Sequence, residues 1–353
     1  MSHDESVERI FLTPEYSVSR IIKGGWHLAG GHGSINTDEA IKDMEDFVEA
    51  GITTFDCADI YTGVEEMIGQ FLVKNKDAFT SGSLPPVQVH TKFVPDYNKL
   101  NDLSTEDIDR VIDRSLKRLR VERLDMVQFA WWTYDAPKYV DAAVHLAKLQ
   151  KAGKIRNIGI TNFNAQAIKR MLDAGVPIVG NQVQYSVLDH RPEQDQQQMA
   201  AEHGFKFLCY GTVAGGFLSD RYLGAPDPEA PLENRSLVKY RLIIDEFGGY
   251  DFFQSTLELL KDIADQYEVG IADMAMRYIL RKPDVGGIIV GARNSKHLEK
   301  LKLVSAFQLS TDDFSRIEQH VLQANGPSGP VYELERDKDG KHGRIMKYNL
   351  NES

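Results

Sequence analysis

Residues 155–184 read IRNIGITNFNAQAIKRMLDAGVPIVGNQVQ. Two apolar runs in this stretch, residues 155–160 and 178–184, do not alternate strictly with polar residues, which is typical of strands buried on both faces. Between them, residues 164–174 have the spacing of an amphipathic helix. A strand, a helix and a second strand in this order predict parallel strands joined by a right-handed crossover.

The same unit recurs along the chain. Further strand-like runs lie at residues 20–23, 52–58, 87–93, 124–131, 205–210 and 286–290. Helical patterns lie at residues 37–50, with Thr37 as the expected N-cap, at 104–119, which opens at Ser104, and at 137–152, 193–203 and 295–305. Eight strands alternating with helices favour a closed (β/α)8 TIM barrel of the α/β class, which takes about 250 residues plus insertions. No linker divides the chain, so we expect a single domain, with the barrel over residues 20–325.

Three segments fall outside this repeat. Residues 1–19 are expected to form a polar N-terminal lead. Residues 220–252 contain several prolines and glycines, and a connection of this length predicts a functional loop after the seventh strand. Residues 326–353 are polar and punctuated by glycine and proline, so they form either a solvated tail or a flap over the barrel mouth.

Composition narrows the class of protein. The chain has 41 basic and 52 acidic residues, a formal net charge of -11, and an acidic surface makes nucleic acid an unexpected partner. Cys57 and Cys209 have apolar neighbours and no CxxC spacing, which favours reduced thiols in a cytoplasmic protein. Neither a signal peptide nor an apolar run of about 18 residues is recognisable, so we expect no membrane association. No metal site is expected, and a monomer and a homo-oligomer both remain possible.

The ends of the second and third strands carry a candidate acid–base unit, because the active site of such a barrel lies at the carboxyl ends of its strands. Asp56 and Tyr61 follow the second strand, and Lys92 ends the third. A phenol has a pKa of about 10, and a nearby ammonium lowers it by favouring the phenolate. This predicts Tyr61 as the general acid or base, Lys92 as the residue that lowers its pKa, and Asp56 as the group that orients Lys92. A structural ion pair with Tyr61 merely nearby is the alternative.

Several motifs resemble those of one enzyme family. The segment GITTFDCADIY at 51–61 resembles the aldo-keto reductase signature, and Lys92 in VHTKF at 89–93 matches the family's lysine. Further similar stretches are SLKRLRVERLD at 115–125, GITNF at 159–163, NQVQY at 181–185 and the segment from Gly291 to Leu298. The resemblance extends from about Arg20 to Phe314. It implies a (β/α)8 barrel that transfers hydride between NADP(H) and a carbonyl or alcohol, with a small organic molecule as substrate.

The resemblance also implies roles for individual residues. It makes Asp56, Tyr61 and Lys92 catalytic. It assigns the nicotinamide amide to Thr161, Asn162 and Gln182, and stacking on the nicotinamide ring to Tyr210. The remaining cofactor-binding residues that it implies lie at the first strand end, along the pyrophosphate, at the 2′-phosphate and near the adenine: Gly25, Trp26, Gly211, Gly215, Phe217, Arg221, Arg293 and His297.

One position departs from the family pattern. In LDMVQFAWW at 124–132, Ala130 stands where the family has a histidine that donates a hydrogen bond to the substrate carbonyl. Loss of one such donor typically lowers turnover by about 10²–10³. Carbonyl reduction could continue with Tyr61 alone, with water, or with His27 or His90 in the gap. The site could instead be repurposed for lyase or isomerase chemistry, bind NADP(H) in a regulatory role, or be an engineered knock-out.

The expected substrate pocket combines these residues with the aromatic side chains at the strand ends. It comprises Trp26, His27, Tyr61, Ala130, Trp131 and Trp132. Aromatic walls favour an apolar or sugar-like substrate. The sequence therefore predicts an NADP(H)-dependent oxidoreductase whose substrate and reaction direction stay open.

Overall fold

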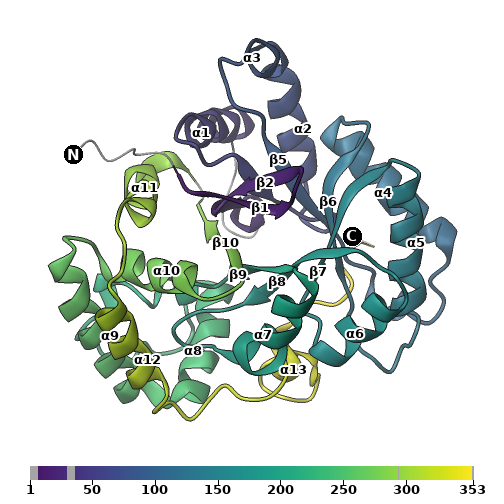
Figure 1. Ribbon diagram of the computed structural model, residues 1–353. Helices are drawn as coiled ribbons and strands as arrows, with labels where there is room; N and C mark the ends of the chain where they lie inside the picture. Colours follow the sequence, from purple (N-terminus) through teal and green to yellow (C-terminus); the bar gives the residue numbers. More distant parts are fainter. Residues whose placement is uncertain (1–6, 30–35, 293, 352–353) are drawn as a thin grey trace.

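The computed structural model describes residues 7–29, 36–292 and 294–351. Eight parallel strands close into a barrel in the order β10-β3-β4-β5-β6-β7-β8-β9, and helices surround it (Figure 1). The barrel strands are β3 (Ile21–Gly24), β4 (Thr54–Asp56), β5 (Gln88–Phe93), β6 (Leu124–Ala130), β7 (Ile155–Thr161), β8 (Ile178–Gln184), β9 (Lys206–Tyr210) and β10 (Val285–Gly291). The expected α/β class and (β/α)8 barrel are therefore confirmed.

Strand register brings the site residues level with one another. Lys92 of β5 lies beside Gln128 of β6, and Ala130 of β6 lies beside Thr161 of β7. Thr161 in turn lies beside Gln182 of β8. Residues from four neighbouring strands thus meet at the carboxyl end of the barrel.

A helix lies close to each of the six ranges that the sequence predicts, and the chain forms further helices that the sequence does not predict. The described helices are α1 (Thr37–Glu49), α2 (Val64–Lys74), α3 (Lys76–Ser81), α4 (Thr105–Leu119), α5 (Tyr139–Lys151), α6 (Ala165–Asp173), α7 (Arg191–His203), α8 (Arg235–Phe247), α9 (Gly249–Gln266), α10 (Ile271–Arg281), α11 (Leu298–Ala306), α12 (Thr311–Val321) and α13 (Glu333–Arg336). Short 3-10 turns are η1 (Trp26–Leu28), η2 (Tyr97–Lys99), η3 (Ala214–Gly216), η4 (Asp220–Tyr222), η5 (Ser295–His297) and η6 (Gly343–Ile345). No described helix is long and apolar enough to cross a membrane.

Two helix starts show how capping residues set the boundaries. Ser104 opens α4 through a capping box with Asp107, as its sequence predicts. The N-cap of α1 is Asn36 rather than Thr37, because the Asn36 side chain accepts hydrogen bonds from the backbone N–H groups of the first turn at 3.0 and 3.4 Å. Thr37 is the first residue of the helix.

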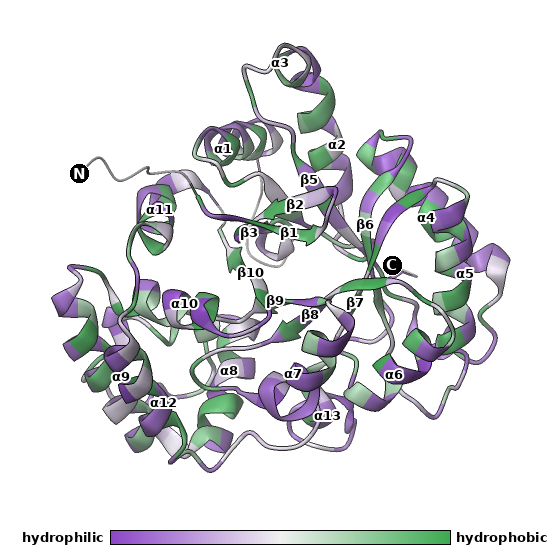
Figure 2. Cartoon of the chain, viewed as in Figure 1, coloured by the Kyte–Doolittle hydropathy of each residue, from purple (hydrophilic) through white to green (hydrophobic). Residues whose placement is uncertain are grey.

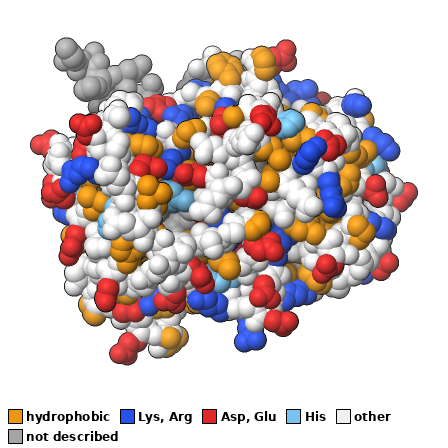
Figure 3. Space-filling view, turned by 60° about the horizontal axis from the view of Figure 1, so that its bottom comes forward, with side chains coloured by type: hydrophobic (Ala, Val, Ile, Leu, Met, Phe, Trp, Pro, Cys, Tyr) orange, Lys and Arg blue, Asp and Glu red, His pale blue; other side chains and the backbone are white. Residues whose placement is uncertain are grey.

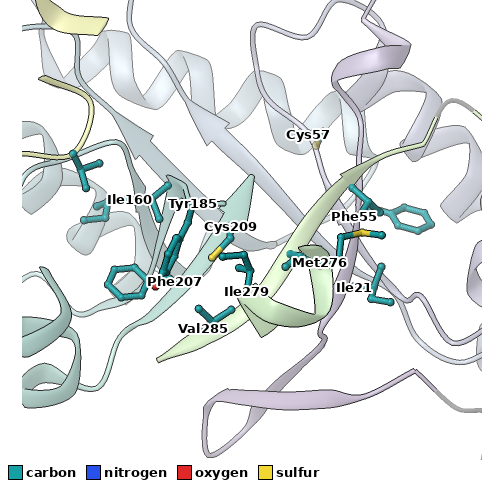
Figure 4. Packing of buried hydrophobic residues seen from close by; sticks show 14 of the residues in the cluster. Ile21, Phe55, Cys57, Ile160, Tyr185, Phe207, Cys209, Met276, Ile279 and Val285 are labelled. Atoms are coloured by element: carbon teal, nitrogen blue, oxygen red, sulfur yellow. The ribbon is translucent and has the colours of Figure 1, made fainter. Parts of the chain in front are cut away.

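The helices direct apolar faces toward the barrel and polar faces outward (Figure 2). Residues of α10 such as Met276 and Ile279 are buried in the same core cluster as the strand residues Phe55 and Phe207, and Figure 4 shows part of this packing. Cys57 and Cys209 are buried free thiols, and they lie well apart in that view. On the outside, acidic and basic side chains are interspersed over the face in Figure 3.

An antiparallel hairpin of β1 (Arg9–Thr13) and β2 (Tyr16–Ser19) covers the amino-terminal end of the barrel (Figure 1). Leu12, Tyr16 and Val18 are buried there and pack against barrel residues Ile22 and Met126. This corrects the expectation of a polar lead over the described residues 7–19. The two strands are short and lie among polar residues. The alternation of apolar and polar residues is therefore too brief to predict them from the sequence.

The segment 220–252 is largely helical rather than a loop. It contains η4, all of α8 and the start of α9. The Asn234 side chain caps α8 by accepting the N–H of Leu237, and buried residues at helical spacing follow. The prolines and Gly224 lie in the first part of the segment, up to Pro231, whereas Gly248 and Gly249 lie at the junction of α8 and α9.

The segment after residue 325 is packed against the barrel. Val331, Glu335 and His342 are buried. Near its end, the Asn351 side chain donates hydrogen bonds to Asp59 and to the Val94 carbonyl at 3.2 and 2.7 Å. These contacts exclude the solvated-tail alternative for the described residues 326–351. We refer to these residues as the tail.

Candidate active site

A cavity of about 760 Å³ lies at the carboxyl ends of the barrel strands. Most residues that the sequence singles out line it together: Trp26, His27, Asp56, Tyr61, Lys92, Ala130, Trp131, Trp132, Thr161, Asn162, Gln182, Tyr210, Gly211 and Gly215. They come from seven strand ends that are far apart in sequence. Closure of the barrel therefore creates the site.

Lys92 and Asp56 form a buried ion pair at the floor of this cavity. The Lys92 ammonium donates to Asp56 Oδ2 at 2.7 Å and to the Cys57 carbonyl at 2.9 Å. Its Nζ is 5.1 Å from the centroid of the Tyr61 ring. Burial alone would lower the pKa of Lys92, but the neighbouring Asp56 and Tyr61 raise it above its ordinary value. The ammonium is therefore held charged beside the phenol.

The pKa of Tyr61 differs in direction from the sequence-based expectation. Burial raises it above the ordinary value, and this outweighs the charge and hydrogen bond of Lys92, which act to lower it. Lys92 therefore acts in the predicted direction, but burial outweighs it, so the net pKa of Tyr61 lies above its ordinary value. Tyr61 is a protonated phenol at neutral pH, with a permanent positive charge next to it.

A pair of glutamines completes the coordination of Asp56. Gln128 and Gln182 both donate to Asp56 Oδ1, at 2.8 and 2.7 Å, and Gln182 also donates to Gln128 Oε1 at 2.8 Å. The sequence reasoning did not single out Gln128, although it lies two residues before Ala130 and so faces the same side of β6. The side-chain nitrogen of Gln182 donates to Asp56 and Gln128. The side-chain oxygen of Gln182, Oε1, is therefore the group that can accept a hydrogen bond from a ligand.

Asn162 is fixed from several directions at the end of β7. Its backbone has a left-handed conformation, with φ of 61°, which asparagine tolerates better than most residues. Its N–H donates to the Gln182 carbonyl at 3.0 Å, and its Oδ1 accepts the Tyr210 hydroxyl at 3.0 Å. The Thr161 hydroxyl donates to the same Gln182 carbonyl at 3.0 Å. Asn162 is thus left with its amide hydrogens as the donor toward a ligand.

Neither of the two described histidines that the sequence suggested takes the place of the imidazole beside Ala130. His90 lies deeper in the barrel, where its Nε2 is 3.0 Å from the Tyr16 hydroxyl, and burial lowers its pKa to about 4. His27 lies against Gly291 of β10, since a Cβ built on that glycine would be 2.2 Å from the His27 ring. In the strand order, β10 is on the opposite side of the barrel from β6, which carries Ala130.

Aromatic side chains form the wall around Tyr61 and Ala130. The Trp26 ring meets the Tyr61 ring edge-on, with centroids 5.2 Å apart. The indole N–H groups of Trp131 and Trp132 donate to the carbonyls of Ala136 and Pro95 at 2.9 and 2.7 Å. Both indole N–H groups are therefore used within the protein, and these rings present apolar surface to the cavity.

Several predicted cofactor residues lie outside this cavity. Phe217 is fully buried against Tyr222, with ring centroids 4.6 Å apart. Arg221 has 68% of its side chain exposed and pairs with Glu233 at 3.1 Å. Gly25 is buried behind the wall, where its N–H donates to the Asp56 carbonyl at 2.7 Å.

A second cavity of about 310 Å³ adjoins the first and includes His297. The two cavities share Gly291. His297 is therefore separate from the acid–base unit but on the same continuous surface. Arg293 lies outside the described residues.

Helix α8, which lies in segment 220–252, and the tail both cover the cavity, although the sequence singled out none of their residues that line it. Helix α8 contributes Arg235, Ser236, Val238, Lys239 and Tyr240, and the tail contributes Tyr332, Ile345, Met346, Lys347 and Leu350. Helix α8 lies directly on the turn after β9, because a Cβ at Gly211 would be 2.2 Å from the Tyr240 hydroxyl. The Asn234 cap followed by apolar residues at helical spacing could have revealed α8, whereas no sequence signal identifies which tail residues reach the cavity.

The cavity is locally positive although the chain is acidic. Among the described residues that line it, Lys92, Arg235, Lys239 and Lys347 are basic and Asp56 is the single carboxylate. Because Asp56 pairs with Lys92, three positive charges remain around the opening. The Lys239 ammonium lies 4.9 Å from the Tyr210 ring centroid, and burial lowers its pKa. The site thus suits an anionic ligand.

Comparison with known proteins identifies the family. Residues 20–322 match the model of the "Aldo/keto reductase family", and the chain belongs to this family of oxidoreductases. It is 26% identical over 320 residues to aldo-keto reductase YhdN of Bacillus subtilis (strain 168), covering 89% of this chain and 92% of that protein. It is 27% identical over 292 residues to aldo-keto reductase yakc [NADP(+)] of Schizosaccharomyces pombe, covering 78% and 80%.

Two further similarities differ in extent. A stretch of 176 residues is 33% identical to flagellar radial spoke protein 5 of Chlamydomonas reinhardtii, and it covers 44% of this chain and only 33% of that protein. Among solved structures, the glycerol dehydrogenase AKR11B4 of Gluconobacter oxydans superposes with a TM-score of 0.74 at 21% identity, over 94% of this chain and 99% of that one. This structural likeness concerns the fold.

Proposed function

We propose that this protein is an NADP(H)-dependent oxidoreductase that interconverts a carbonyl and an alcohol, with Tyr61 as general acid and base. The observation that carries the proposal is the buried Lys92–Asp56 pair beside Tyr61 in a cavity at the strand ends. Family membership supports it, and so does NADP(+) in the name of the Schizosaccharomyces pombe relative. The free buried thiols are compatible with a cytoplasmic location.

The residues around the cavity fit NADP(H). A nicotinamide carboxamide needs one donor and one acceptor. The side-chain NH₂ group of Asn162 and the side-chain oxygen of Gln182 supply this pair. The Tyr210 ring lines the same part of the cavity, and the cations around the opening suit phosphates. The second cavity, next to His297, continues this surface beyond Gly291. When bound, the cofactor supplies or accepts the hydride.

The acid–base unit is set up for proton donation. Because burial keeps the pKa of Tyr61 above its ordinary value, the phenol holds its proton until a neighbouring oxygen becomes negative. Lys92 then stabilises the phenolate that forms, and Asp56 with its two glutamines keeps the ammonium in place. At neutral pH, Tyr61 is therefore in the protonation state that carbonyl reduction requires.

Ala130 sets the character of the substrate site. Without an imidazole at this position, Tyr61 is the side chain in position to donate to the substrate oxygen. The space beside it is bounded by Trp26, Trp132 and apolar tail residues. These features support a bulky apolar aldehyde or ketone, bound by its apolar part and reduced slowly.

The test is a fluorescence titration with NADPH, followed by a panel of aldehydes and ketones monitored at 340 nm. We expect saturable NADPH binding, and turnover that is higher with aromatic than with small aliphatic carbonyls. Absence of NADPH binding would contradict the proposal. Binding without turnover of any carbonyl or alcohol would instead indicate a dinucleotide-binding protein.

A further inference from the structure

The short tail helix α13 ends at Arg336, a half-buried residue that reaches two strand ends. Its guanidinium donates to the Trp131 carbonyl at 2.6 Å and to the Asn162 carbonyl at 2.5 Å. The guanidinium carbon also lies 4.2 Å from the centroid of the Tyr134 ring. One side chain thus connects the tail with the residue after Ala130 and with the residue that offers the donor to the nicotinamide.

Asn162 depends on such contacts for its position. Its left-handed backbone is an uncommon conformation that persists where the surroundings fix it. Gln182 binds its N–H and Tyr210 binds its Oδ1. The Arg336 hydrogen bond holds its carbonyl, which is the remaining backbone group. Without it, the left-handed backbone of Asn162 loses one of the hydrogen bonds that hold it in place.

We propose that Arg336 is a positioning residue for the nicotinamide end of the cofactor site, acting through Asn162. This inference rests on the proposed NADP(H) function. Through Trp131, the same guanidinium holds the end of β6, where Ala130 replaces the family's histidine. The tail is then a structural part of the cofactor site in addition to covering it.

A buried ion pair fixes the helix that carries Arg336. The neighbouring Glu335 accepts two hydrogen bonds from Arg191, at 2.9 and 3.1 Å, and Arg191 also binds Asp189 at 2.8 and 3.0 Å. Asp189 in turn accepts the side chain of Gln184 from the end of β8, at 2.6 Å. Helix α13 is therefore tied to β6 and β7 through Arg336, and to β8 through Glu335.

The geometry requires an arginine. A planar guanidinium can donate to two carbonyls at once while its face stacks on a tyrosine ring, whereas a lysine ammonium can satisfy one carbonyl well and does not stack in this way. Arg336→Lys should therefore keep part of the function, and Arg336→Gln should lose most of it. Arg344→Gln serves as a matched control, because Arg344 is an exposed tail arginine that does not line the cavity.

The experiment compares two ligands in each variant. One is NADPH, and the other is 2′-phosphoadenosine diphosphoribose, which lacks the nicotinamide. We expect Arg336→Gln to raise the Kd for NADPH about tenfold, Arg336→Lys to raise it by less, and both to leave the Kd for the fragment within about twofold. Arg344→Gln should change neither Kd, and the ligand-free variants should show the same protease resistance of the tail as the wild type.

Four outcomes would overturn the inference or the proposed function on which it rests. Equal weakening of both ligands in Arg336→Gln would indicate general loosening of the barrel, and so would a tail that becomes protease-sensitive in both variants. Unchanged NADPH affinity would show that Arg336 does not position Asn162. Wild-type protein that binds neither ligand would contradict the proposed function itself. That result is read from the wild type alone, whereas the role of Arg336 is read from the ratio between variant and wild type.

Discussion

The two walls of the cavity are built in different ways. The strand-end wall includes Asp56, Tyr61, Lys92 and Gln182. Hydrogen bonds from Lys92, Gln182 and the buried Gln128 to Asp56 run from one barrel strand to another. The covering wall consists of α8 and the tail. Its cationic side chains Arg235 and Lys347 are exposed, and long-range contacts such as those of Arg336 attach it to the barrel.

This difference separates chemistry from binding. Strand register fixes the acid–base groups to one another, so they are in place before any ligand arrives. The covering wall adds positive charge and apolar surface, and contacts such as those of Arg336 attach it to the barrel. We therefore expect substitutions in the strand-end wall to change turnover, and substitutions in the covering wall to change affinity or tail stability.

The largest expected effect is that of Tyr61→Phe in the strand-end wall. Loss of the phenolic proton should lower kcat for carbonyl reduction by about 10²–10⁴, while the Kd for NADPH changes little. Stopped-flow or steady-state assays at 340 nm measure the first quantity, and fluorescence titration measures the second. Tyr250→Phe, on α9 and away from the cavity, should leave both unchanged. Full activity of Tyr61→Phe would remove the proposed mechanism.

The next effect concerns the attachment of the covering wall through Glu335. Burial acts to raise the pKa of Glu335, but Arg191 overrides this and lowers it to about 2. Relative to an ordinary value of about 4.5, this corresponds to about 3 kcal/mol of stabilisation by the charged carboxylate. Because the pKa is lowered in the folded state, the stabilisation is complete above pH about 4.5 and is lost as the pH falls toward 2.

Glu335→Gln should therefore destabilise the tail by about 3 kcal/mol at neutral pH, and this difference from the wild type should shrink below pH about 4.5. Hydrogen exchange of residues 326–351 and limited proteolysis measure the effect. Glu333→Gln is the control, since Glu333 is exposed on the same helix. A difference that stays constant down to pH 3 would contradict the assignment of the charge.

The sequence predicts the two walls unequally, for physical reasons. Barrel strands are recognisable in the sequence as apolar runs without polar alternation. The ends of these strands converge when the barrel closes, so the sequence could place Asp56, Tyr61 and Lys92 together. The direction in which the pKa of Tyr61 shifts could not be predicted, because it is decided by burial, which depends on packing of distant segments. Arg235 and Arg336 lie in segments outside the strand–helix repeat. The path of these segments across the cavity is not indicated by any local pattern of apolar residues.

The smallest expected effect concerns two exposed arginines, Arg221 and Arg235, of which only Arg235 lines the cavity. The family resemblance implies that Arg221 binds a phosphate, yet Arg221 lies outside the cavity and pairs with Glu233 at 3.1 Å. Arg235 lines the cavity and donates to the Ile345 carbonyl of the tail at 2.7 Å. Both side chains are exposed, so solvent screening should limit the effect of removing either charge.

We expect Arg235→Gln to weaken NADPH binding about fivefold, and Arg221→Gln to weaken it by less than about twofold. The Arg235 effect should diminish as salt rises from low to physiological ionic strength, because a charge at an open cavity mouth is screened. Titrations of both variants at two salt concentrations measure this. The reverse ranking would mean that Glu233 releases Arg221 when the cofactor binds, and that the covering wall extends over the turn at η4.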